Sequence, residues 1–265
     1  MSALSYVYCL VASRRAPRPP RARLGLPGLG KLRVLDAGGG LWLACADAPA
    51  ARFGEAAIAR GLEQLDWVAK CAIAHEAVVE YFASADAVVP LKLFTLFTSD
   101  TRALGFVAAM RPKLDRVVRR VTGCDEWGVR VSLDKRRAYA GARKAAPRPA
   151  AGTPSGTSFL LRKKQEHDIT RSLTARAAEQ AREIYDELAA IARECQRRPP
   201  AGGPEVGPAV LLDAVFLVSS GQEKRFQAAL RRATKQAAEH GLGVTLTGPW
   251  PPYHFAHVQT ARAAS

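Results

Sequence analysis

Four residues with catalytic or metal-binding chemistry, Cys71, His75, Glu76 and Glu80, stand at i, i+4 spacings in one predicted helix. Side chains four residues apart share a helix face, so Cys71 and His75 could act as nucleophile and base, or as two metal ligands. The sequence His-Glu-x-x-x-Glu is not the His-Glu-x-x-His of zinc proteases. We therefore prefer the simpler interpretation, in which a thiol and a hydrogen-bonded imidazole pack in the interior. An enzyme with a reactive thiol at Cys71 stays open as the weaker alternative.

Two other segments carry partial motifs. Gly25–Leu32 nearly spells the phosphate-binding loop G-x-x-x-x-G-K-[ST], but Leu32 stands where that loop needs a hydroxyl for Mg²⁺. The residues before it form an Arg/Pro loop, where the motif requires a strand. His254 and His257 could bind a metal, but no third ligand lies close in sequence. We expect no catalytic residues, no cofactor and no metal.

The net positive charge of the chain comes from two stretches, because the rest of the chain is neutral overall. Residues 14–33 contribute +7 and residues 134–164 contribute +8, which together equal the formal charge of +15. Both stretches are rich in Pro or Gly, so we expect loops. Basic loops can bind nucleic acid through phosphates. They hold few aromatic side chains for base stacking, so solvated loops are preferred and nucleic-acid binding is kept as the alternative function.

The spacing of the cysteines and the lengths of the apolar runs indicate in which cellular compartment the protein is expected. The five cysteines are widely spaced and form no C-x-x-C pair, which favours reduced thiols over a disulfide framework. The apolar stretch Ala3–Ala12 precedes Arg14 and Arg15, the reverse of a secretory signal. No apolar run reaches the ~18 residues of a membrane span. We expect a soluble, cytoplasmic protein.

Hydrophobic periodicity predicts the elements that would position these residues. Leu62, Leu65, Ala69, Ala72, Glu76 and Val79 form a stripe at helical spacing, with Cys71 and His75 at its edges. Strands are expected at 6–11, 32–35, 41–46, 88–98, 127–133, 210–218 and 242–246. The turn 36–40, with three glycines, predicts a hairpin between the second and third strands. Alternation in 127–133 places Trp127, Val129, Val131 and Leu133 on one buried side.

One or two helices are expected at 52–82, and one each from an N-cap at Thr101 to 122, at 158–197 and at 226–240. The helical spacing of the long helix continues through Leu188, Ile191 and Cys195.

This order predicts an α+β fold with two domains. We place an N-terminal α+β domain at 1–122 and a C-terminal domain at 123–265, the latter a modified ferredoxin-like β-α-β-α-β unit. The second domain would contain a basic linker at about 135–156 and an extended tail at 249–265. A boundary inside the linker, at 138–156, is the alternative.

The tail is the most distinctive segment. Gly248–Phe255 places Trp250, Tyr253 and Phe255 among three prolines, which favours an extended segment that loses little entropy on docking. The three aromatic side chains could pack back onto the second domain, or they could contact another protein. We single them out as tentative partner-contact residues.

Several segments, in this order, resemble the gas vesicle proteins of the GvpL/GvpF family. They are Tyr6-Val7-Tyr8, Trp67 through His75, Val89-Pro90-Leu91-Lys92-Leu93-Phe94-Thr95, Glu126-Trp127-Gly128-Val129-Arg130-Val131, Gly156–Leu160 and the tail Gly-Pro-Trp-Pro-Pro-Tyr-x-Phe. Thr95 stands where the family usually has Gly. The resemblance covers nearly the whole chain.

The resemblance implies a non-enzymatic accessory or minor structural protein of gas vesicle formation, located at the gas vesicle and in the cytoplasm. Its expected partners are the hydrophobic shell protein and other gas vesicle accessory proteins, with neither membrane nor nucleic acid expected as a partner. His75, Pro90, Glu126 and Trp127 match the family pattern, which gives them no role. Shell subunits with exposed apolar faces aggregate unless covered, and aromatic surface and edge strands of this chain could cover them.

Overall fold

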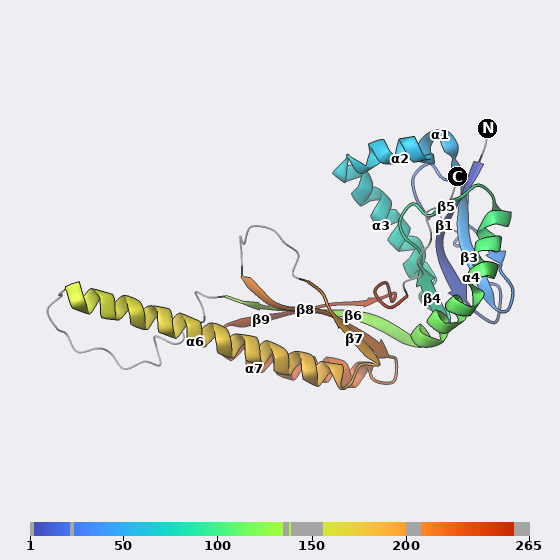
Figure 1. The fold of residues 1–265 in the computed structure, drawn as a ribbon. Helices are drawn as coiled ribbons and strands as arrows, with labels where there is room; N and C mark the ends of the chain where they lie inside the picture. Colours follow the sequence, from blue (N-terminus) through green and yellow to red (C-terminus); the bar gives the residue numbers. More distant parts are fainter. Residues whose placement is uncertain (1–2, 22–23, 135–137, 139–155, 200–207, 257–265) are drawn as a thin grey trace. The chain divides into compact units, whose positions relative to one another are not determined.

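The computed structural model describes residues 3–21, 24–134, 138, 156–199 and 208–256 of the chain. These residues form an α+β protein with two antiparallel sheets, as the element order predicts (Figure 1). The chain divides into one unit of residues 1–126 with 249–265, and a second unit of residues 127–248. The described part of the tail, residues 249–256, clusters with the first unit, whereas we expected the tail in the C-terminal domain.

The sheet of the first unit is built around β1 (Ala3–Ala12), whose residues from Tyr6 to Val11 are buried. Its strand order is β2-β3-β1-β4, with β5 also pairing with β1. The other strands are β2 (Arg33–Asp36), β3 (Leu41–Pro49), β4 (Ala87–Pro90) and β5 (Leu96–Phe97). Three glycines with positive φ, Gly38, Gly39 and Gly40, turn β2 into β3, and this confirms the predicted hairpin.

The strand predicted at 88–98 is wrong in its middle. β4 ends at Pro90 and β5 begins at Leu96, and Phe94 between them has a φ of 62°. A backbone in this left-handed region cannot continue a strand. The ring of Phe94 stacks on Trp67 with centroids 5.0 Å apart, which gives the bend a packing partner.

The helices of the first unit are α1 (Ala50–Phe53), α2 (Glu55–Leu62), α3 (Leu65–Tyr81) and α4 (Asp100–Val121). The segment 52–82, where one or two helices were expected, thus lies in three helices. The N-cap of α4 is Ser99, whose hydroxyl accepts from the Arg102 N–H at 3.2 Å, and not the expected Thr101.

The first four residues of the predicted apolar stripe on α2 and α3 are exposed, whereas its last residue, Val79, is buried. The buried side chains of α3 are Cys71, His75, Val78 and Val79. Leu65 is 81% exposed, and Leu62, Ala69 and Ala72 are exposed as well. Both sets step along the helix at intervals of three or four residues, so the periodicity alone does not tell which face packs.

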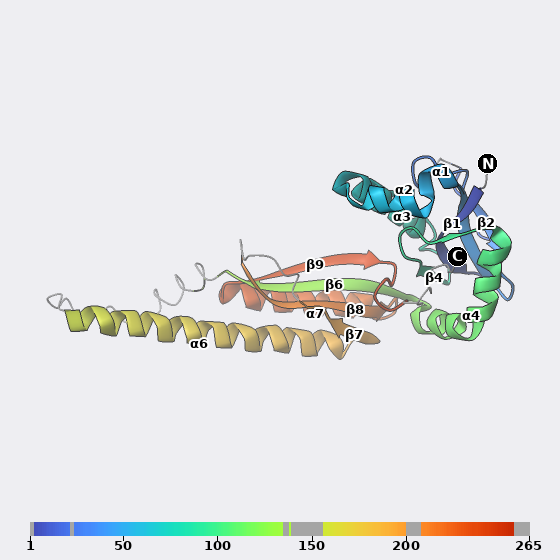
Figure 2. The same cartoon turned by 45° about the horizontal axis from the view of Figure 1, so that its top comes forward.

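The second unit contains β6 (Cys124–Leu133), α6 (Gly156–Ala189), β7 (Glu194–Arg197), β8 (Ala209–Ser219), α7 (Glu223–Glu239) and β9 (Leu242–Trp250). The first three residues of β6 and the last two of β9 group with the first unit. The strand order is β7-β8-β6-β9, and in Figure 2 the helices α6 and α7 follow one face of this sheet.

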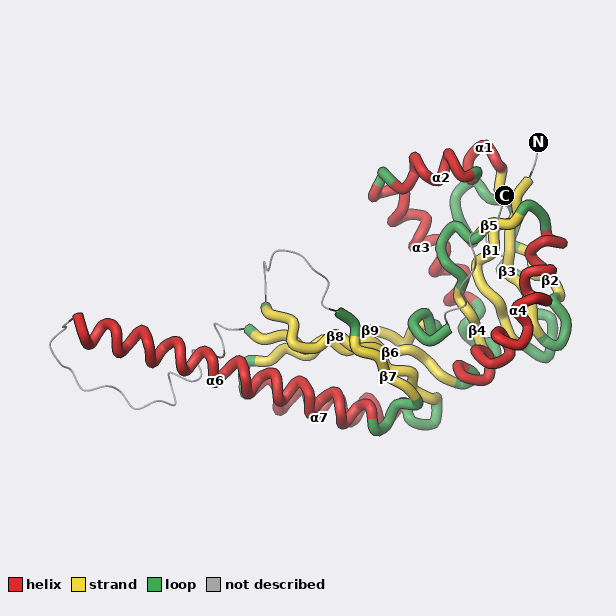
Figure 3. Tube along the Cα trace, viewed as in Figure 1, coloured by secondary structure: helices red, strands yellow, loops and turns green. Residues whose placement is uncertain are grey.

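The helix predicted at 158–197 is too long, because α6 ends at Ala189 and residues 194–197 form β7. Cys195, which the helical spacing seemed to include, pairs instead with Phe216 on β8. The sequence Glu-Cys-Gln-Arg of this short strand contains no β-branched or aromatic residue, so nothing in it signalled a strand. In Figure 3 the four strands of this sheet appear in yellow.

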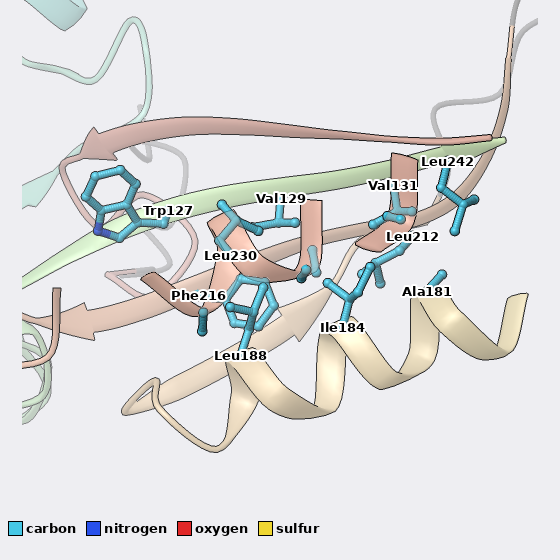
Figure 4. Close-up of a cluster of buried hydrophobic side chains, with 14 of the residues drawn as sticks. Trp127, Val129, Val131, Ala181, Ile184, Leu188, Leu212, Phe216, Leu230 and Leu242 are labelled. Atoms are coloured by element: carbon cyan, nitrogen blue, oxygen red, sulfur yellow. The ribbon is translucent and has the colours of Figure 1, made fainter. Parts of the chain in front are cut away.

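The predicted alternation along β6 is confirmed. Trp127, Val129, Val131 and Leu133 are all buried and belong to one apolar cluster. Figure 4 shows Ala181, Ile184 and Leu188 of α6 pointing into the same cluster, with Phe216 of β8 and Leu230 of α7. None of the described helices combines the length and apolarity that a bilayer crossing requires.

Candidate functional site

His75 is a buried, neutral residue that ties α3 to β1. Its Nδ1 lies 2.7 Å from the Tyr6 hydroxyl and its Nε2 lies 3.1 Å from the carbonyl oxygen of Leu91. That oxygen can only accept, so Nε2 carries the proton and Nδ1 accepts from Tyr6. Burial lowers the pKa of His75 from 6.5 to about 4 and raises that of Tyr6. Both ring nitrogens are therefore engaged in structural bonds, as the simpler interpretation of the sequence had it.

The other residues of the Cys71 group are not assembled into a site. Cys71 is buried, and burial raises the pKa of its thiol, which disfavours a nucleophilic thiolate. Glu80 is exposed, whereas Glu76 bonds to the tail. Among the described residues, no three His, Cys, Asp or Glu side chains form a group that could hold a metal ion.

The Gly25–Leu32 segment closes the apolar core of the first unit. Leu26 and Leu29 are buried, and the Leu26 N–H donates to the Tyr8 hydroxyl at 3.0 Å. Gly25 has a φ of 116°, which favours glycine at this bend. No helix follows the segment, so the dipole of a helix N-terminus that would hold a phosphate is missing at this place.

The tail packs onto the first unit through its aromatic side chains. Phe255 is buried under the Arg120 guanidinium, whose carbon lies 5.8 Å from the ring centroid. The Tyr253 hydroxyl donates to Glu76 Oε2. Trp250 remains 39% exposed. Of the three tentative partner-contact residues, only Trp250 thus presents a large exposed surface, whereas Tyr253 and Phe255 are engaged within the chain.

Two carboxylates, Glu76 and Glu126, accept hydrogen bonds from the tail. The sequence did not indicate either contact. Glu126 is buried, and its two oxygens meet the His254 backbone N–H at 2.8 Å and the His254 Nδ1 at 2.6 Å. Burial raises the pKa of Glu76, and the hydrogen bond from Tyr253 partly opposes this. Sequence separations of 128 and 177 residues left no local signal for either contact. His257 lies outside the described residues.

Pro90 and Trp127 have structural surroundings. Pro90 is the last residue of β4, an edge strand, where a missing N–H costs no ladder bond. Trp127 is buried in the cluster of the second unit, with its ring 6.3 Å from that of Phe226. Its indole N–H finds no acceptor within the described part of the chain.

The first basic stretch is partly neutralised. Arg33 binds Asp47 at 2.9 Å and Asp100 at 2.7 Å, and this pairing holds the pKa of Asp100 below its usual range. Arg14, Arg15 and other bases of this stretch are exposed. Most of the second stretch, 134–164, lies outside the described residues. Among the described residues, no surface for base stacking supports the alternative function of nucleic-acid binding. That hypothesis therefore rests on charge alone.

The largest exposed apolar side chains of the first unit gather on α2 and α3. Leu65 is 81% and Ile73 is 72% exposed. Residues 55–81 carry five acids against two bases, opposite in sign to the chain as a whole. We call the exposed set of Leu62, Leu65, Ala69, Ala72 and Ile73 the α3 stripe. The two helices meet at a tip away from the sheet (Figures 1 and 2).

A family model described as "Gas vesicle synthesis protein GvpL/GvpF" matches residues 4–257. The chain belongs to this family. It is 30% identical over 215 residues to "Gas vesicle protein L" of Streptomyces sp. (strain CB03234), which covers 79% of this chain and 77% of that protein. The resemblance found in the sequence is therefore confirmed, and the chain has a role in gas vesicle formation.

Two crystal structures of GvpF share the fold of this GvpL/GvpF-family chain. The protein from Anabaena sp. PCC7120 matches with a TM-score of 0.67 at 16% identity, covering 100% of both chains. The protein from Microcystis aeruginosa matches with a TM-score of 0.65 at 14% identity, covering 97% of this chain and 100% of its own. At these identities the likeness concerns the fold.

Proposed function

We propose that the protein is a non-enzymatic accessory protein that binds the gas vesicle shell protein, and other accessory proteins, during nucleation or assembly. The observation that carries the proposal is the α3 stripe. Apolar side chains on a surface helix cost free energy in water and mark a surface for a partner. The shell protein, an expected partner of this family, would supply the complementary apolar face.

The acidic surroundings of the stripe add selectivity. Glu63 and Asp66 flank Leu65, and both carboxylates are exposed. Charges at the rim of an apolar contact steer association and reject like-charged partners. The stripe therefore favours a neutral or basic helix of the partner and disfavours a second acidic surface.

Trp250 would provide a second contact. It is exposed, whereas Tyr253 and Phe255 hold the rest of the tail on the first unit. An anchored tail presents its indole ring without ordering a loose segment at the moment of binding, which lowers the entropic cost.

The absence of enzymatic activity is part of the proposal. Burial keeps His75 neutral and both of its ring nitrogens are hydrogen-bonded, and the raised pKa of Cys71 disfavours attack by its thiol. A protein that covers apolar surfaces needs neither group to react. It would act in the cytoplasm and at the gas vesicle.

We infer further that the C-terminal domain is ferredoxin-like. The order β6-α6-β7-β8-α7-β9 with the sheet order β7-β8-β6-β9 supports this, since it is a β-α-β-β-α-β unit. The earlier expectation of β-α-β-α-β lacked β7. A deletion series around residues 122–127 and 248–249, followed by urea unfolding of each fragment, would test where the domains separate.

Binding and aggregation assays test the proposed function. Purified protein should retain the shell protein in a pull-down and delay its light scattering after dilution from denaturant. Leu65→Gln together with Ile73→Gln should weaken both effects by at least about tenfold, because two apolar contacts of about 1 kcal/mol each are lost. Val210→Gln on β8 is the matched control, since Val210 is also exposed but lies in the second unit. Failure of the wild-type protein to bind the shell protein would refute the proposal.

A further inference from the structure

β9 is an edge strand whose residues 242–247 lack the usual protection, since its one shielding residue, Pro249, lies near its end. It is nine residues long, whereas the other edge of the same sheet, β7, has four residues with Glu194 and Arg197 at its ends. No charged residue occurs from Gly241 to Tyr253. Proteins normally shield sheet edges with short strands, charges or bulges, because an edge presents unpaired backbone groups to any other strand.

The register between β9 and β6 shows which backbone groups of β9 point away from β6. Three contacts define one antiparallel register, in which Gly241 lies opposite Asp134, Gly243 opposite Ser132 and Thr247 opposite Gly128. The Asp134 N–H donates to the Gly241 carbonyl oxygen at 3.2 Å, and the Thr247 hydroxyl lies 3.5 Å from the Gly128 carbonyl oxygen. A Cβ added to Gly243 would lie 3.3 Å from Ser132 Oγ. In such a ladder, alternate residues bond to the neighbour. Gly241, Gly243 and Thr247 thus face β6, and Val244 and Leu246 turn their N–H and C=O outward.

The side chains of β9 indicate what kind of strand would fit. Leu242 is buried and Val244 is partly buried against the cluster of the second unit, but Leu246 on the same side is 37% exposed. Thr245 and Thr247 are exposed on the other side. A strand added here would need apolar side chains on one side, small polar ones on the other, and no charge.

We propose that β9 pairs with β9 of a second copy of this chain, antiparallel across a two-fold axis, and joins the two four-stranded sheets into one. The chain itself carries the strand that the edge requires. In a two-fold antiparallel pair, the outward-facing Val244 and Leu246 oppose outward-facing residues of the partner and exchange N–H···O bonds with them. Threonines then oppose threonines on one side, and apolar side chains oppose one another on the other.

The net charge predicts how the dimer responds to salt. Two chains of +15 repel each other, although the paired strands themselves carry no charge. Salt screens this repulsion, so the dimer strengthens between about 50 and 300 mM NaCl. Pairing of β9 with an acidic partner protein would weaken as salt is added. The salt dependence therefore distinguishes a second copy of this chain from an acidic partner.

Sedimentation of the full chain over a concentration series tests the dimer. The wild type should shift from monomer to dimer below about 200 μM, a modest affinity near 5 kcal/mol for a contact of this size. Thr245→Lys should weaken the dimer at least about tenfold, because two like charges then oppose each other across the axis. Gln196→Lys adds the same charge to the β7 edge, where Gln196 is exposed, and should change the affinity less than about twofold.

A second variant keeps the test valid if Thr245→Lys unfolds. Leu246→Pro removes an N–H that points away from β6 and so leaves the intramolecular ladder intact. It should abolish the dimer, and amide hydrogen exchange at Val244 and Leu246 of the wild type should slow as concentration rises. A wild type that is monomeric at about 200 μM in 300 mM salt overturns the proposal. Equal effects of Thr245→Lys and Gln196→Lys overturn it as well.

Discussion

Acidification should lower the free energy of unfolding of the protein, because His75 becomes protonated. The Tyr6 hydroxyl donates to Nδ1 of the ring, Nε2 donates to the Leu91 carbonyl oxygen, and the ring is buried. A protonated imidazole would lose the bond from Tyr6 and would place a charge in an apolar interior. Burial is accordingly the largest cause of its lowered pKa.

The size and the sign follow from linkage. The pKa is 6.5 in the unfolded chain and about 4 in the folded one, so between these values the unfolded chain binds more protons. The stabilising contribution is present above about pH 6.5 and is lost as the pH falls to about 4. At about 1.4 kcal/mol for each pH unit, the loss amounts to about 3 kcal/mol.

Urea unfolding at a series of pH values measures the effect. His75→Gln is the informative variant, because its amide can donate to Leu91 and accept from Tyr6 without titrating. The free energy of unfolding should fall by about 3 kcal/mol more in the wild type than in this variant between pH 7 and 4. The partly buried Glu76, whose raised pKa acts with the opposite sign, is present in both proteins and cancels in the difference. Parallel pH profiles, or an NMR titration of His75 near pH 6.5, would refute the reasoning.

Two further results are expected from other contacts. Glu126→Gln should destabilise the protein by about 2 kcal/mol and accelerate proteolysis of the tail, because a charge-assisted bond to His254 is lost. A double-mutant cycle with His254→Ala should give a coupling free energy of about 1 kcal/mol. Additive effects of the two substitutions would contradict the contact. A thiol reagent at neutral pH should label Cys195, which is partly exposed, well before the buried Cys71, and rapid labelling of Cys71 in folded protein would revive the enzyme alternative.

The parts of the fold that could be predicted from sequence are those with a strong local pattern. The alternation from Trp127 to Leu133 identified both the strand and its buried side. The three glycines after Asp36 identified the hairpin. In each case the periodicity or the backbone requirement is contained within ten residues, so tertiary contacts did not need to be known.

The errors occur where tertiary contacts decide. The helical spacing that continued through Cys195 described residues that in fact pair with β8. The stripe through Leu65 was correctly predicted to be helical, but the side of α3 that packs carries Cys71, His75, Val78 and Val79. Tyr6 and Leu91 offer hydrogen bonds to the imidazole on that side. A polar residue on the buried side and apolar residues on the exposed side reverse the usual pattern, and such reversals are expected where a surface serves a partner.

The tail is a further case in which the sequence could not show the tertiary contacts, and its aromatic side chains have different surroundings in the structure. Its composition predicted docking, but the composition could not choose between its own chain and another protein. The structure adds the two carboxylates, Glu76 and Glu126, which fix Tyr253 and His254. A buried carboxylate is costly without donors, so Glu126 stabilises the docked tail and has both oxygens satisfied by His254, whereas the partly buried Glu76 receives its one bond from Tyr253. Because this anchoring uses the residues after Pro252, Trp250 is left at the surface, where an aromatic ring on a fixed backbone is suited to contact a partner.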